Sequence, residues 1–185
     1  MVSPGTGDRG VTVLLTGLPS AGKTTIALLL ADRLRAEGHR IQVLDGDEMR
    51  KTLSAGLGFD RAGRHENLLR IGLLAEVLAR NGVIVLVPVV APYAESRDTV
   101  RRQHSESATA YLEVHVATPV EVCAERDVKG LYAKQQAGEL TGLTGVDDPY
   151  EVPKEPDLVI PTVQQSADEA AALLMDLLKE ERFVA

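Results

Sequence analysis

Hydrophobic and polar positions follow two patterns along this chain, one typical of buried strands and one of helices. Short runs in which nearly every residue is apolar suit strands that are covered on both faces. They predict five strands, at residues 11–16, 41–44, 83–90, 111–116 and 158–160. Between them lie apolar residues at helical spacing, helix-start and helix-stop residues, and one polar helical stretch. These features predict helices at 24–37, 66–80, 96–105, 119–125 and 166–181.

Strands that alternate with helices predict an α/β fold: a five-stranded parallel sheet with helices on both faces, in a single domain at residues 11–185. Residues 1–10 are rich in Gly, Ser, Pro and Asp and are expected to form a flexible tail that does not contact the core. Residues 127–156 are polar and rich in turn residues. We expect this long segment to be a moving lid that excludes water, and a plain surface insertion is the alternative.

Residues 17–24 read GLPSAGKT and match the phosphate-binding pattern G-x-x-x-x-G-K-[ST], between a predicted strand and a predicted helix. Its glycines let backbone N–H groups face phosphate oxygens, and the helix adds its positive N-terminus. We expect Lys23 to contact the β- and γ-phosphates of ATP, and the Thr24 hydroxyl to hold Mg²⁺. The alternative is a glycine-rich turn with a coincidental lysine. The nucleotide-binding residues expected here are Gly17, Leu18, Pro19, Ser20, Ala21, Gly22, Lys23, Thr24 and Thr25. A P-loop kinase fold follows from this context.

Two carboxylates, Asp45 and Asp47, come directly after the second predicted strand. The carboxyl ends of strands in an open α/β sheet are where ligands bind. Carboxylates placed there beside ATP help to hold Mg²⁺ or accept the proton of an attacking hydroxyl. An ordinary Asp-Gly turn is the alternative interpretation.

Composition and charge indicate which classes of partner this protein binds. The net charge of −7 shows no basic footprint, which argues against binding of duplex nucleic acid. The only cysteine, Cys123, forms no intramolecular disulfide and suggests a reducing compartment. The longest apolar run, within residues 83–91, is too short to span a bilayer, and the N-terminus lacks the apolar core of a signal peptide. These features favour a cytoplasmic protein that acts on a small molecule, without a membrane or nucleic-acid partner.

Six segments between residues 11 and 161 together resemble the adenylyl-sulfate (APS) kinase family. They read GLPSAGKTT, LDGDEMRKTLSAGLGF, RHENLLR, APYAESRD, TPVEVCAERDVKGLYAK and AGELTGLTGVDDPYE. The resemblance implies transfer of the γ-phosphoryl group of ATP, with Mg²⁺, to the 3′-hydroxyl of APS, which yields PAPS in sulfate activation. It also implies a homodimer.

The same resemblance implies roles for individual residues. Asp47 is expected to be the general base and, with Lys23, the catalytic pair. Arg126 and Lys129 are expected near ATP, and Thr24 and Asp45 near the metal. The residues expected to bind the acceptor are Asp45, Asp47, Arg50, Phe59, Arg64, Asn67, Val90, Ala91, Lys134 and Leu143. Arginine forks suit the phosphosulfate anion, and a flat aromatic face suits adenine.

Several positions depart from the family pattern, among them Gly63, where Asp is common, and Glu48, where Asn is usual. Leu143 stands where the family commonly has Phe, Ala91 where it often has Ser, and Leu69 where Arg is common. These departures keep two alternatives open. One is a kinase of the same fold that phosphorylates another small hydroxyl compound. The other is a nucleotide-binding regulator without turnover.

Overall fold

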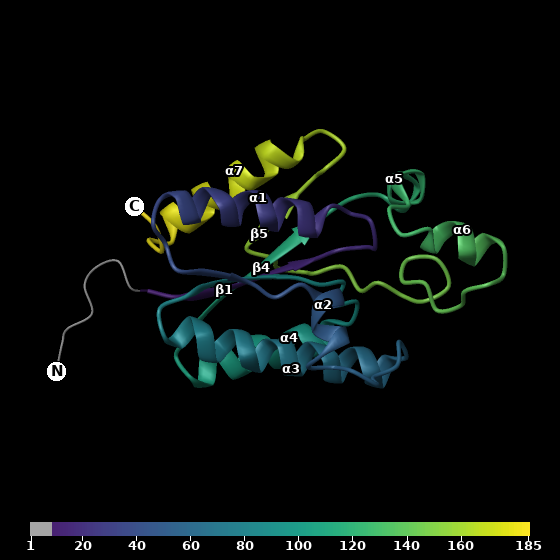
Figure 1. Ribbon diagram of the computed structural model, residues 1–185, viewed down its shortest axis with the longest axis horizontal. Coiled ribbons are helices and arrows are strands. Elements are labelled where there is room, and N and C mark those ends of the chain that lie inside the picture. The colour runs from purple at the N-terminus through teal and green to yellow at the C-terminus, as the bar shows by residue number, and fades with distance from the viewer. Residues whose placement is uncertain (1–8) are drawn as a thin grey trace.

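The computed structural model of this chain describes residues 9–185, and its centre is a sheet of five parallel strands (Figure 1). The strands are β1 (Val11–Thr16), β2 (Ile41–Val43), β3 (Ile84–Pro88), β4 (Ala110–Val116) and β5 (Leu158–Ile160). Their order is β2-β3-β1-β4-β5, with Val13 of β1 paired to Leu86 of β3 and to Leu112 of β4. The predicted α/β class and parallel sheet are confirmed.

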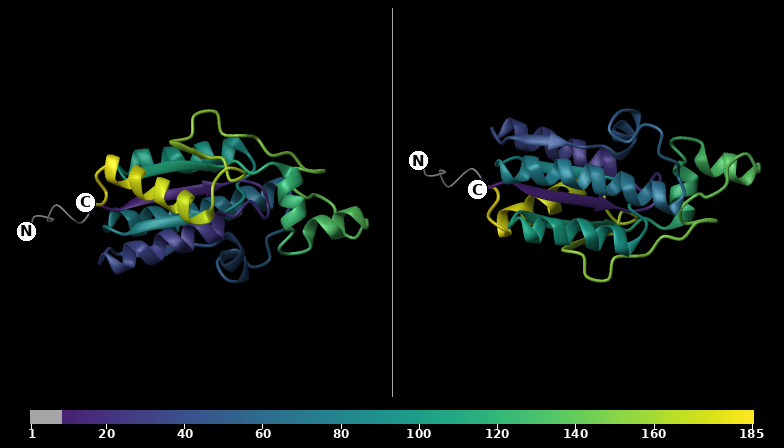
Figure 2. Two further views of the ribbon diagram at one scale, coloured as in Figure 1. Left: turned by 90° about the horizontal axis from the view of Figure 1, so that it is seen from above. Right: turned by 90° about the horizontal axis from the view of Figure 1, so that it is seen from below.

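Helices cover both faces of the sheet. They are α1 (Lys23–Ala36), α2 (Gly46–Lys51), α3 (Arg61–Arg80), α4 (Ala94–Glu106), α5 (Val120–Arg126), α6 (Leu131–Gln136) and α7 (Ala167–Glu180). Helices α1 and α7 lie side by side on one face, and α3 and α4 lie on the other (Figure 1). Helices α5 and α6 lie beyond the carboxyl ends of the strands, where the chain projects from the sheet (Figure 2).

The central strand explains why its sequence does not alternate. All six residues of β1 are buried, because each face of the strand meets a separate hydrophobic core. Val13 and Leu15 belong to the core under α1 and α7, whereas Leu14 belongs to the core under α3 and α4. Burial of each such side chain contributes roughly 1.5–3 kcal/mol relative to exposure. The two cores hold the carboxyl end of β1, and hence the loop that follows it, in place.

Two short helices and one helix start differ from the predictions. Helices α2 and α6 are too short to show helical periodicity in the sequence. Helix α3 begins at Arg61 rather than at residue 66, because the Asp60 carboxylate accepts a hydrogen bond from the backbone N–H of Gly63 at 2.9 Å. Helix α7 begins with a capping box formed by Ser166 and Glu169, close to the predicted start at residue 166.

Residues 1–8 of the predicted tail lie outside the described part of the chain. The expectation that residues 9 and 10 do not contact the rest of the protein is wrong. The Arg9 guanidinium lies 5.0 Å from the ring centroid of Phe183, and a Cβ on Gly10 would lie 2.1 Å from the Ala79 carbonyl oxygen. Within residues 9–185, no helix has the length and apolar character needed to cross a bilayer.

Candidate functional site

A cavity of about 670 Å³ opens at the carboxyl ends of the strands, between the phosphate-binding loop, the α2–α3 region and the segment 127–156, which we call the lid segment. Most residues predicted for the site line it. These are Pro19, Ser20, Ala21, Gly22, Lys23, Thr24, Thr25, Asp47, Arg50, Phe59, Arg64, Asn67, Val90, Ala91, Arg126, Lys129 and Leu143. Four predicted residues are not part of the lining, namely Gly17, Leu18, Asp45 and Lys134.

The phosphate-binding loop needs glycine at both ends. A Cβ on Gly17 would lie 2.6 Å from the Val116 carbonyl oxygen, so the loop can pass close to β4 only because glycine has no Cβ. Gly22 has a φ of 102°, in the left-handed region, and is the N-cap of α1. Among the described residues no side chain caps α1. The first N–H groups of this helix therefore remain free to bind an anion.

Lys23 lies in this loop with its side chain almost fully buried. Its ammonium group donates hydrogen bonds to the carbonyl oxygens of Gly17 at 2.9 Å and Leu18 at 2.7 Å. Burial lowers the pKa of Lys23 to about 8, because the charged form loses hydration. An ammonium bonded to two neutral carbonyls gains more from a negatively charged ligand than one already bonded to a carboxylate.

Thr24 connects the loop to the predicted acidic residues. Its hydroxyl donates to Asp45 Oδ2 at 2.7 Å. The other carboxylate oxygen of Asp45 accepts from the backbone N–H of Asp47 at 2.9 Å and caps α2. Asp45 is therefore a cap that also places a carboxylate beside the Thr24 hydroxyl. In the described residues, no cluster of three or more His, Cys, Asp or Glu side chains could hold a metal by itself.

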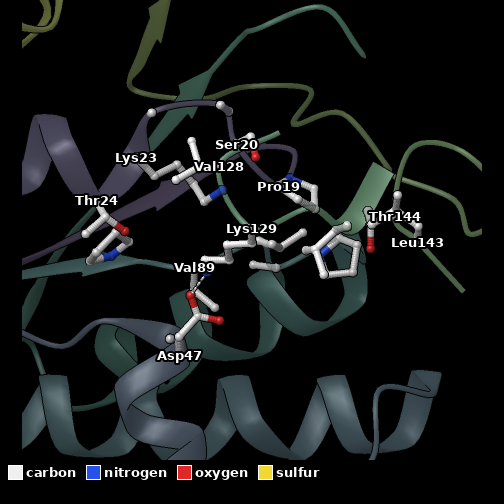
Figure 3. Close-up of a pocket in the computed structure, with 18 of the residues that line it drawn as sticks. Pro19, Ser20, Lys23, Thr24, Asp47, Val89, Val128, Lys129, Leu143 and Thr144 are labelled. Atoms are coloured by element: carbon white, nitrogen blue, oxygen red, sulfur yellow. Dashed lines mark hydrogen bonds and ion pairs between the residues drawn. The ribbon is translucent and has the colours of Figure 1, made fainter. Parts of the chain in front are cut away.

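Asp47 faces the loop from the first turn of α2, and its side chain is 60% exposed. A Cβ on the preceding Gly46 would lie 2.9 Å from a methyl group of Val89, so α2 begins in close contact with the chain after β3. The Asp47 carboxylate forms an ion pair with the ammonium of Lys129, which extends from the lid segment (Figure 3). Sequence reasoning placed these residues in different roles and did not predict that they pair.

Two arginines and one phenylalanine form the opposite part of the cavity. Arg50 donates to the Gly58 carbonyl oxygen at 3.1 Å, and its guanidinium lies 4.2 Å from the Phe59 ring centroid. Arg64 donates to the Phe59 carbonyl oxygen at 2.6 Å and to that of Gly142 at 3.0 Å. Phe59 is 66% exposed and lines the cavity, so its ring is accessible to a ligand. Burial and the nearby Arg64 charge lower the pKa of Arg50, as expected where two cations face one space.

Three polar side chains in the cavity wall have an unpaired atom. Within residues 9–185, the buried Asn67 Oδ1, Thr144 Oγ1 and Gln165 Oε1 atoms have no hydrogen-bond partner. All three residues line the cavity, and Asn67 is 3% exposed. Buried polar atoms are rarely left unpaired in folded proteins, so these three suit hydrogen bonds to a ligand.

A buried arginine that sequence reasoning missed, Arg97, supports the wall formed by Val90 and Ala91. Arg97 is 2% exposed and donates to the carbonyl oxygens of Ala91 at 2.8 Å and Glu151 at 2.7 Å. Its charge is balanced by Glu113 at 2.8 Å. Ala91 has a φ of 44°, a left-handed conformation that is uncommon outside glycine. Arg97 belongs to a polar helical stretch, where nothing in the sequence pattern marks it as buried.

The lid segment packs on the phosphate-binding loop. The Tyr132 hydroxyl donates to the Pro19 carbonyl oxygen at 3.1 Å, and a Cβ on Gly145 would lie 2.5 Å from a methyl group of Leu18. Leu143 is buried and lines the cavity at the position where an aromatic residue is common in the resembling family. Lys134 is exposed on α6, so the structure does not bring it to the site.

Comparison with known proteins agrees with this geometry. A family model described as adenylylsulphate kinase matches residues 9–161. The adenylyl-sulfate kinase of Synechococcus sp. strain JA-2-3B'a(2-13) is 49% identical over 176 residues, which cover 95% of this chain and 98% of that protein. The structure of the Mycobacterium tuberculosis APS kinase CysC in complex with AMPPNP and APS matches with a TM-score of 0.90 and 46% identity, over 92% of this chain and 98% of the other. The hexameric APS kinase from Thiobacillus denitrificans matches with a TM-score of 0.74 and 33% identity, over 99% of this chain and 31% of that longer chain.

Proposed function

The chain belongs to the adenylylsulphate kinase family, and from that premise we propose that it transfers the γ-phosphoryl group of ATP to the 3′-hydroxyl of adenylyl sulfate. The observation that carries the proposal is the arrangement of the cavity. An anion-binding loop with a buried lysine forms one side, and a carboxylate on α2 faces it from the other. A similar protein of known structure holds both an ATP analogue and APS.

The loop at residues 17–24 binds the triphosphate in this proposal. Its free N–H groups and the N-terminus of α1 contact phosphate oxygens. Lys23 exchanges its two carbonyl partners for the β- and γ-phosphates, since its ammonium binds a negatively charged oxygen more strongly than a neutral carbonyl oxygen. Arg126, which donates to the Ala21 carbonyl oxygen at 3.3 Å, stands at the same loop.

Mg²⁺ fits the oxygen atoms present beside the loop. Magnesium in phosphoryl-transfer sites takes one or two protein oxygens, several waters and the substrate phosphates. The Thr24 hydroxyl and the Asp45 carboxylate, 2.7 Å apart, supply oxygens of this kind. When bound there, the ion neutralises charge on the β- and γ-phosphates.

The carboxylate of Asp47 acts on the acceptor. It accepts the proton of the 3′-hydroxyl while the hydroxyl oxygen forms its bond to the γ-phosphorus and ADP leaves. Arg50 and Arg64 bind the phosphosulfate anion, Phe59 stacks on adenine, and the unpaired oxygen of Asn67 accepts a hydrogen bond from the acceptor.

Release of ADP with and without APS tests the proposal, in wild type and in an Asp47→Asn variant. We expect APS-dependent release in wild type and a loss of about 10²- to 10⁴-fold in the variant, the usual contribution of a general base. Binding of ATP is expected to survive. No APS-dependent release in wild type, with release for another alcohol, would identify a different acceptor. ATP binding without any acceptor-dependent release would identify a regulator instead.

The homodimer and the cytoplasmic location also remain proposals. The dimer is implied by the family, and one structural relative is described as hexameric. Sedimentation velocity at micromolar concentration distinguishes a dimer from a monomer and from larger assemblies. The cytoplasmic location rests on a single, buried cysteine, which suits a reducing compartment.

A further inference from the structure

The ion pair between Lys129 and Asp47 joins the lid segment to α2 across the cavity (Figure 3). We propose that Lys129 is a positioning residue: its ammonium stays paired with the Asp47 carboxylate until an acceptor hydroxyl displaces the ammonium. Lys129 thereby suppresses transfer of the γ-phosphoryl group to water. The inference rests on the proposed function, because it assigns Asp47 as the base.

The exposure of the pair shows that it is not a structural fastening. The side chains of Lys129 and Asp47 are 55% and 60% exposed. Ion pairs in such a position contribute little to folding, because water competes for both charges. The lid segment is held to the loop by other contacts, among them the hydrogen bond from Tyr132 to Pro19. The pair is therefore free to open and close without unfolding the lid.

The Lys129 ammonium has two alternative partners, namely the Asp47 carboxylate and the phosphates of a bound nucleotide. It lies near enough to Lys23 that its positive charge helps to lower the pKa of that lysine, whereas Asp47 acts in the opposite direction. The two ammonium groups and the carboxylate thus share one part of the cavity, all three residues being in its lining. Once released from Asp47, the Lys129 ammonium faces the same phosphate charge as Lys23.

Transfer of the phosphoryl group to water and transfer to the acceptor hydroxyl differ in the molecule that must reach Asp47. A water molecule is held by few contacts, so it competes poorly with the Lys129 ammonium for the carboxylate. An acceptor held by the arginines brings its hydroxyl to Asp47 with much of its freedom already lost, and so displaces the ammonium. In the productive step, the hydroxyl oxygen bonds to the γ-phosphorus, and the bond to the β,γ-bridging oxygen breaks with its electron pair leaving on ADP. The proton moves to Asp47. Neutral Asp47 no longer attracts Lys129, whose charge then faces the transferring phosphoryl group.

Removal of the charge at this position tests the inference. We compare wild type with Lys129→Met, which keeps the length of the side chain, and with Lys129→Arg, which keeps the charge. The ratio of ADP release without acceptor to APS-dependent release is expected to rise about tenfold in Lys129→Met, a fraction of what a freed base contributes. Lys129→Arg is expected to restore a ratio near that of wild type. Lys154→Met, at an exposed lysine of the same lid segment outside the cavity lining, serves as the control for lost charge.

A double variant, Asp47→Asn with Lys129→Met, separates this effect from a loosened lid. The extra hydrolysis is expected to disappear, because it needs the carboxylate. An unchanged ratio in Lys129→Met, or extra hydrolysis that persists in the double variant, overturns the inference while APS-dependent activity of wild type leaves the proposed function standing. If wild type shows no response to APS, the proposed function fails. Acceptor-independent hydrolysis in the single and double variants then still decides the role of Lys129.

Discussion

The two halves of the cavity are built in different ways. The nucleotide half is largely backbone, because the glycines at residues 17 and 22 and the N-terminus of α1 place N–H groups from one continuous segment. The acceptor half consists of side chains from separate segments, such as Arg50, Phe59 and Arg64, which approach one another only in the folded chain. The contrast implies that changes in the acceptor half alter recognition of the acceptor and leave the nucleotide half intact.

Among the variants that test this difference between the two halves, we expect the largest change in KM for APS at Arg64. An Arg64→Lys variant keeps the charge but loses the fork that binds an anion with two parallel hydrogen bonds. The KM for APS is expected to rise about 10- to 100-fold, the usual value of a hydrogen bond between charged groups, with ATP affinity unchanged. Arg80→Lys is the matched control, because Arg80 lies on the same helix, 55% exposed and paired with Glu76. Equal effects in both variants, or lost ATP affinity, would break the contrast.

A smaller effect is expected in the nucleotide half, and it depends on pH. Burial lowers the pKa of Lys23 to about 8 in the protein without nucleotide. Bound phosphates favour the ammonium and raise this pKa, so binding takes up a proton above about pH 8. Affinity for ATP is therefore expected to fall by up to about tenfold per pH unit above pH 8, and Lys23 contributes no pH dependence well below it. Calorimetry at pH 9 in two buffers of different ionisation enthalpy measures the proton directly, and zero uptake contradicts the prediction.

The smallest effect is expected at Phe59. A Phe59→Leu variant keeps an apolar side chain but loses the flat face, so the KM for APS is expected to rise about 2- to 10-fold. Stability is expected to change by less than about 0.5 kcal/mol, because the ring is 66% exposed. Thermal unfolding and steady-state kinetics measure the two quantities. A KM equal to that of wild type would show that the ring serves only to pack against Arg50.

The sequence predicted the framework well because its signals are local. Buried strands such as β1 are continuous apolar runs, and the phosphate-binding loop is one contiguous motif. Helices α2 and α6 escaped prediction because each is too short for a periodic pattern. The cap that starts α3 at Arg61 was missed for a related reason, since its first turn is polar.

The acceptor half of the cavity could be predicted only in part from the sequence. Phe59 was expected at the site from the family resemblance, and the structure shows its ring exposed beside Arg50 in the cavity lining. The pairing of Asp47 with Lys129 joins residues far apart in the chain, so no local pattern indicates it. The role of Lys134 remains a prediction from the family resemblance alone, because this residue lies outside the cavity lining.

Arg97 ties one end of the lid segment to the wall of the cavity. Its guanidinium binds the carbonyl oxygen of Ala91 and that of Glu151, near the second end of the lid segment. The backbone N–H of Glu151 also donates to the Pro92 carbonyl oxygen at 2.8 Å. These two contacts fix that end of the segment to the acceptor wall. If the segment moves as the sequence predicts, we expect the movement in the stretch that begins after α5, while the acceptor wall keeps its shape.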